Sequence, residues 1–186
     1  MSGFLIEAAA FLIELALELY IFAVLLRLLL QIVRADFYNP VAQFVVALTN
    51  PLLRPLRRLI PGVFGIDVAS ILLLFALKVL EIVLINALFA KPVWFIGVAI
   101  KAVHDLLILT LQVFLFAVFI RVLLSWVIPY GTPNPVMGML VRLTEPLMRP
   151  ARRLVPPVGG LDISPIIVIA GLYLAMMAVP YLFGYR

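Results

Sequence analysis

Two arginine-rich segments hold the side chains of this sequence that are best suited to bind an anion. Residues 50–61 read NPLLRPLRRLIP, and residues 145–156 read EPLMRPARRLVP. On a helix, arginines spaced i, i+3 and i+4 share one face, and the leucines take the other face. The arginines so spaced are Arg54, Arg57 and Arg58 in the first segment and Arg149, Arg152 and Arg153 in the second. We therefore predict that both segments lie in a membrane interface, with guanidinium groups at the depth of lipid phosphates.

The same arginines have a simpler explanation, because positive residues are retained on the cytoplasmic side of a membrane and so set topology. Topology requires charge but not helical spacing, and both segments repeat the spacing and the prolines. The pattern therefore favours a built surface, for anionic lipid headgroups or for a membrane or cytoplasmic protein partner. Both occupants stay open at this point, as does oligomerisation. Apolar runs interrupt the positive charges, so we expect no direct binding of nucleic acid.

A second set of candidates consists of polar side chains inside long apolar stretches, namely Glu18, Lys78, Glu81 and Gln112. An isolated charge inside a bilayer is costly, so such residues often mark an ion or proton pathway. An ion or proton transporter or channel is therefore the alternative function. Lys78 and Glu81 lie three residues apart on one helix and could instead neutralise each other. Structural packing is the simpler interpretation of the whole set.

A third set consists of two arginines and two aspartates at matching places in the sequence. Arg27 and Arg121 lie about 10 Å inside the expected cytoplasmic ends of their helices. Their guanidinium groups could extend to the interface. Alternatively, Arg27 pairs with Asp67, and Arg121 pairs with Asp162, since each aspartate opens the following helix. Each aspartate is also placed to cap that helix, a role compatible with an ion pair.

The sequence offers little for catalysis. It has no cysteine, which excludes disulfides, thiolate metal sites and thiol nucleophiles. His104 is its single histidine, so a zinc site of the usual kind has too few ligands. No glycine-rich phosphate loop follows a strand. We expect a protein that is not an enzyme, with no catalytic residue, cofactor or metal.

Composition places the chain in a membrane, because 66% of its residues are hydrophobic and 12% are charged. A helix needs about 20 apolar residues to cross the hydrocarbon core. Four stretches qualify, at approximately residues 4–33, 66–90, 106–128 and 161–183. Residues 93–100 are too short to span and are predicted to form an interfacial connector with Trp94. The fold class is therefore all-α integral membrane, with four transmembrane helices.

The sequence is duplicated well beyond the arginine-rich segments. Arg27 matches Arg121, Asn39-Pro40 matches Asn134-Pro135, Thr49 matches Thr144, and Asp67 matches Asp162. We predict two repeats, residues 1–92 and 93–186, each with two crossings and therefore in the same orientation. Within each loop, an asparagine cap and a proline should start a short amphipathic helix. The next proline should end that helix near Thr49 or Thr144.

Orientation follows from the positive residues. The loops at 34–65 and 129–160 hold four arginines each, whereas the middle connector holds Lys91 and Lys101. Both loops should be cytoplasmic, with both termini outside. In a Gram-negative cell this describes a multi-pass protein of the inner (plasma) membrane with periplasmic termini.

The repeated loop carries a family resemblance. RADFYNPVAQFVVALTNPLLRPLRRLIP and its second version TPNPVMGMLVRLTEPLMRPARRLVPPVGGLDISP resemble the YggT family, also called YlmG, in its duplicated proteobacterial form. The resemblance implies a membrane protein of undefined biochemistry. It also implies links to cell division, nucleoid distribution, membrane cytochrome assembly and osmotic tolerance in different lineages. The duplication preserves the basic loops. It does not preserve Lys78 and Glu81, whose matching positions in the second repeat are Tyr173 and Met176. We therefore expect a membrane-organising or partner-recruiting scaffold ahead of a transporter.

Overall fold

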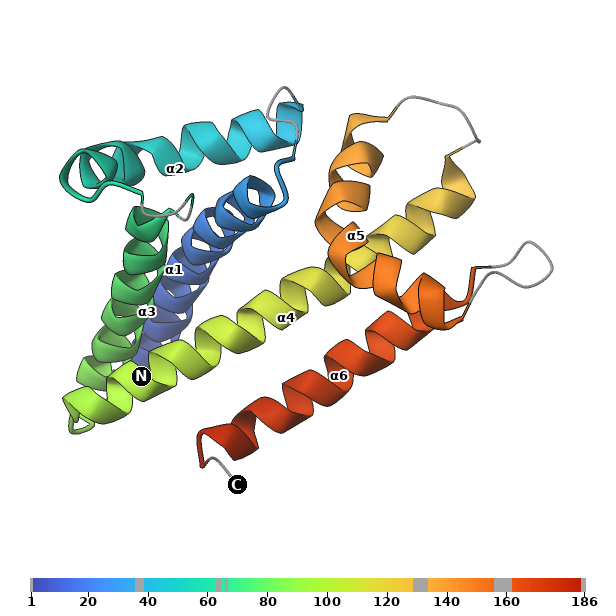
Figure 1. Cartoon of the computed structure of the whole chain (residues 1–186). Coiled ribbons are helices and arrows are strands. Elements are labelled where there is room, and N and C mark those ends of the chain that lie inside the picture. The colour runs from blue at the N-terminus through green and yellow to red at the C-terminus, as the bar shows by residue number, and fades with distance from the viewer. Residues whose placement is uncertain are drawn as a thin grey trace. The chain divides into compact units, whose positions relative to one another are not determined.

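The computed structural model of the chain describes residues 2–35, 39–62, 65, 67–128, 134–155 and 162–184. Within these ranges the chain forms six helices and no strand (Figure 1). The helices are α1 (Ser2–Ile32), α2 (Pro40–Leu59), α3 (Val68–Leu88), α4 (Phe95–Val127), α5 (Pro135–Leu154) and α6 (Ser164–Leu182). The prediction of an all-α protein is confirmed.

Four of these helices, α1, α3, α4 and α6, are long and apolar enough to cross a membrane. A helix satisfies its backbone N–H and C=O groups internally, which is why apolar stretches of this length adopt that form in lipid. The four crossings predicted from hydropathy are therefore found, with similar boundaries for α1, α3 and α6.

The third long helix starts earlier than the predicted crossing, and the prediction that residues 93–100 form a connector separate from it is wrong. Helix α4 begins at Phe95 and continues without a break to Val127. No proline occurs in residues 93–128. Lys101 and Asp105 form an i, i+4 ion pair, with 2.8 Å between Nζ and Oδ2, on the turn where the two stretches were separated. This pair stabilises the helix across its most polar part.

The loop helices start where the sequence predicts. Helix α2 begins at Pro40 and α5 at Pro135, where a missing N–H costs no hydrogen bond. The Asn134 side chain accepts a hydrogen bond from the N–H of Met137 at 3.1 Å, and the Asn39 side chain accepts one from Val41 at 2.8 Å.

The predicted ends of these helices at Thr49 and Thr144 are wrong. Each helix has 20 residues and continues through two internal prolines, Pro51 and Pro55 in α2 and Pro146 and Pro150 in α5. Each loop thus contains one long amphipathic helix instead of a short helix followed by a separate basic segment. An internal proline removes a backbone hydrogen bond and bends the helix. Figure 1 shows α5 turning sharply within its length.

The chain divides into two compact units. The first contains Met1–Leu28 and Val45–Leu107, and the second contains Leu29–Phe44 and Ile108–Arg186. In the first unit, α2 lies across adjacent ends of α1 and α3 (Figure 1), and Ile82 of α3 packs with Val98 and Ala102 of α4. Each unit contains residues of both predicted repeats. The repeat boundary near residue 92 therefore stays a prediction.

The core of the second unit joins three helices. Val118 of α4 packs with Met148 and Ala151 of α5 and with Val168 and Leu172 of α6. Helix α5 is therefore held on its apolar side by two spanning helices, which leaves its opposite side exposed.

Candidate lipid- or partner-binding site

Arg27 anchors α2 in the first unit. This arginine is 6% exposed. Its Nη1 donates hydrogen bonds to Thr49 Oγ1 at 2.7 Å, Asn50 Oδ1 at 3.0 Å and the Val46 carbonyl at 3.4 Å. These acceptors lie in the turn that Pro51 disrupts, so a buried guanidinium supplies donors where the proline weakens the backbone ladder.

Arg121 does the same in the second unit. Its Nη1 donates to Thr144 Oγ1 at 2.7 Å and lies 3.6 Å from Glu145 Oε2. Both threonines are fully buried, and their hydroxyls donate in turn to the carbonyls of Val45 and Leu140, at 2.7 Å each. The duplication thus preserves the hydrogen bond from arginine to threonine, although Thr49 and Thr144 were not among the residues predicted for a site. The matching Thr49 and Thr144 beside matching prolines were the available signal.

The predicted ion pairs Arg27–Asp67 and Arg121–Asp162 are corrected by this geometry. The buried Arg27 and the half-buried Arg121 each reach the threonine of a loop helix instead, because that loop helix crosses the end of the spanning helix. Arg27 does not extend to the surface either.

The aspartates pair with arginines of the loop helices. Asp67 Oδ2 accepts hydrogen bonds from Arg57 Nε at 3.2 Å and from Arg57 Nη2, and Asp162 Oδ2 accepts one from Arg152 Nε at 3.0 Å. Both pairs span ten residues of chain. Asp67 also caps α3, through the N–H of Ser70. Asp162 accepts from the N–H of Ser164 at 3.0 Å.

These contacts lower the pKa of both carboxyl groups. Burial raises the pKa of Asp67, but hydrogen bonds from Arg57 and Ser70 outweigh it, so the pKa lies below its ordinary value. The pKa of Asp162 is lowered likewise, since burial is outweighed by hydrogen bonds from Ser164 and Arg152. Two of the six candidate arginines, Arg57 and Arg152, therefore have a structural role.

Asp67→Ala is expected to lower the free energy of unfolding by about 2 kcal/mol, because it removes a helix cap and a charge-assisted hydrogen bond. Asp162→Ala should cost less, since the Asp162 side chain is 34% exposed and that of Asp67 is 6% exposed. A carboxyl group whose pKa is lowered by folding stabilises the folded state when the pH is above the ordinary aspartate pKa of about 3.9. This stabilisation is lost as the pH falls through the pKa of the folded state. Denaturant titrations of detergent-solubilised protein should therefore show the Asp67→Ala defect at pH 7 and its decline below about pH 4. Equal defects in the two variants would contradict the different burial of the two pairs.

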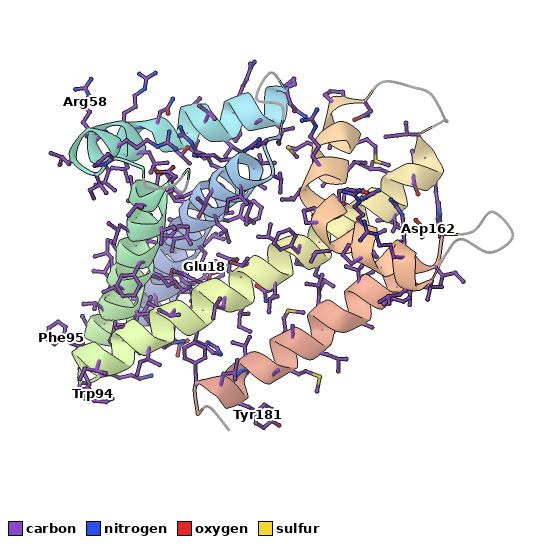
Figure 2. The ribbon with its side chains drawn as sticks, viewed as in Figure 1. Glu18, Arg58, Trp94, Phe95, Asp162 and Tyr181 are labelled. Carbon is purple, nitrogen blue, oxygen red and sulfur yellow. The ribbon has the colours of Figure 1, made fainter. Side chains whose placement is uncertain are left out.

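The other four arginines have no partner among the described residues and are therefore available to bind a ligand. Arg54, Arg58, Arg149 and Arg153 are exposed, and none forms an ion pair or hydrogen bond with a described residue. They stand i, i+4 apart at matching positions of α2 and α5. Figure 2 shows Arg58 directed away from the helices that α2 crosses. Beside them, Leu59 and Leu154 are 80% and 77% exposed. We call these four arginines the exposed arginine set.

Three of the intramembrane polar candidates, Glu18, Lys78 and Glu81, come together in the first unit. In the first unit, Lys78 Nζ lies 2.7 Å from Glu81 Oε1 and 3.3 Å from Glu18 Oε1. The ion pair between Lys78 and Glu81 is therefore formed as the spacing suggested. Gln112 belongs to the second unit. Glu14, which was not among the predicted candidates, joins this cluster. Its position four residues before Glu18 was the available signal.

Comparisons with known proteins identify the family. The model for the family described as CCB3/YggT matches this chain twice, at residues 6–88 and 100–183. The chain belongs to the CCB3/YggT family. The resemblance seen in the loop segments is thereby confirmed, and the two matches of the family correspond to two copies of its basic unit.

Relatives within the family cover most of the chain. An uncharacterized protein of Pseudomonas aeruginosa is 44% identical over 174 residues, which cover 92% of this chain and 88% of the relative. The uncharacterized protein YggT of Escherichia coli K12 is 40% identical over 172 residues, covering 91% and 87%. The uncharacterized protein ycf19 of Guillardia theta matches 60 residues at 43% identity, 31% of this chain and 63% of the relative. No solved structure matches the chain significantly.

Proposed function

We propose that this membrane protein is a scaffold that organises anionic phospholipid at the cytoplasmic face through α2 and α5. The observation that carries the proposal is the exposed arginine set, which repeats in both helices without partners among the described residues. Guanidinium groups pair with phosphate through two parallel hydrogen bonds. An acidic protein partner is the other occupant that the same charge would attract.

The leucines beside these arginines support a lipid occupant. An interfacial helix places apolar side chains among acyl chains and its cations at the headgroups, and each cation near an anionic leaflet contributes about 1 kcal/mol. Leu59 and Leu154 are among the most exposed apolar side chains in the part of the chain that the structure describes. An acidic protein would use the cations but would not require large apolar side chains beside them in both helices.

The proposal is tested by replacing the exposed arginine set and measuring the anionic phospholipid that stays bound to the purified protein. Loss of a protein partner with unchanged lipid binding would assign the surface to protein recruitment. If neither the bound phospholipid nor the bound protein partners changed, the arginines would act only as a topology signal.

The scaffold requires a defined orientation, with α2 and α5 cytoplasmic and both termini outside. Eight arginines in the two loops, against Lys91 between α3 and α4 and Lys101 near the start of α4, support this orientation. In a Gram-negative cell the membrane is then the inner membrane. A cysteine introduced at Thr132 is expected to react with a membrane-impermeant label only from the cytoplasmic side, and one at Ser2 only from outside. Labelling of Thr132→Cys in intact cells would contradict the orientation.

A further inference from the structure

We propose that Glu14, Glu18 and Glu81 bind a divalent cation of the calcium class in the spanning part of the first unit. This site is separate from the exposed arginine set and does not depend on the scaffold function. It combines two carboxylates of α1 with one of α3, and Figure 2 shows Glu18 in the middle part of α1.

The carboxylates converge at the spacing of metal ligands. One oxygen from each of the three side chains lies within 4.8 Å of the others. Calcium binds oxygen at about 2.3–2.6 Å, so ligands on opposite sides of one ion are about 5 Å apart. Carboxylates are also the ligand type that a hard cation prefers. Glu14 and Glu18 are exposed, so the described helices do not enclose these two carboxylates.

The charge of the cluster is not balanced by its own residues. Lys78 is the cation that pairs with the cluster among the described residues, through Glu81 and Glu18. Three carboxylates therefore share one ammonium, and two negative charges remain. Uncompensated charge in a membrane segment costs several kcal/mol. A divalent cation removes this cost fully, which favours it over a monovalent one.

A buried oxygen without a partner is the second observation that points to a ligand. The Glu81 side chain is 5% exposed, and its Oε1 accepts from Lys78. Its Oε2 is buried with no hydrogen-bond partner among the described residues. Such an acceptor requires a donor or a metal ion. We assign Oε2 to the cation, while Oε1 accepts the hydrogen bond from Lys78.

The test measures binding of radioactive Ca²⁺ to the full-length protein in nanodiscs of phosphatidylcholine, which carry no anionic lipid to compete. Wild-type protein is expected to bind stoichiometric Ca²⁺. Glu81→Gln should weaken binding at least about tenfold, because it removes a charged ligand. Lys78→Met should strengthen binding several-fold, since it removes a like charge beside the ion. Glu7→Gln, an exposed glutamate of α1 outside the cluster, is the matched control and should change nothing.

Four results would overturn the proposal. These are no Ca²⁺ binding by the wild type up to millimolar concentration, equal loss in Glu7→Gln and Glu81→Gln, unchanged binding in Glu81→Gln, or weaker binding in Lys78→Met. Absent Ca²⁺ binding together with a rise in melting temperature on acidification, lost in Glu81→Gln, would show that protons neutralise the cluster instead. If Glu81→Gln fails to fold, the exposed variants Glu14→Gln and Glu18→Gln must each weaken binding.

Discussion

Replacement of the whole exposed arginine set by glutamine, in R54Q/R58Q/R149Q/R153Q, is expected to weaken retention of anionic phospholipid by about a thousandfold. Each cation contributes about 1 kcal/mol near an anionic surface, and about 1.4 kcal/mol corresponds to a factor of ten. The two-residue variant R54Q/R58Q should lose only about half of that free energy, because α5 keeps its own pair. Retention is measured as the ratio of phosphatidylglycerol to phosphatidylcholine that copurifies in mixed micelles.

Lysine at the same four positions provides the matched control. Either cation is retained on the cytoplasmic side, so the lysine variant should insert normally. It loses the planar guanidinium and its paired contacts with phosphate, so we expect retention between that of the wild type and that of the glutamine variant. Full retention in a correctly inserted glutamine variant would contradict the lipid surface.

Arg27→Ala is expected to lower the free energy of unfolding by about 3 kcal/mol, the largest effect of any single change proposed for this protein. The substitution removes a 6% exposed side chain and leaves the oxygens of Asn50 and Val46 without this donor. It also removes the donors that support α2 at Pro51. The free energy is measured by denaturant titration in neutral detergent.

Two comparisons control this prediction. Arg121→Ala should cost less, since the Arg121 side chain is 11% exposed and its second acceptor, Glu145, also pairs with Arg152. Arg54→Ala, at an exposed position of α2, should cost about 0.5 kcal/mol or less. An Arg27→Ala protein as stable as Arg54→Ala would show that the arginine does not anchor the helix.

The sequence by itself determined the features that depend on short stretches of chain. Apolar length identified the four spanning helices, because burial of backbone in lipid depends on the residues of each segment alone. Asn39 with Pro40 and Asn134 with Pro135 located the starts of α2 and α5, since a cap acts within one turn. The duplicated loop segments identified the family, and two matches of the family confirm it.

Only the tertiary structure decided where the loop helices end and which polar groups meet. Judged from neighbouring residues alone, Pro51 should end α2 and Pro146 should end α5. Arginines of the spanning helices support the continuation of both helices, because Arg27 donates to Thr49 and Arg121 donates to Thr144. The same long-range geometry commits Arg57 and Arg152 to aspartates and leaves the exposed arginine set for a ligand. It also brings Glu14 and Glu18 to Glu81. Such pairings depend on how different helices cross. The pattern of residues within a single helix does not determine that crossing.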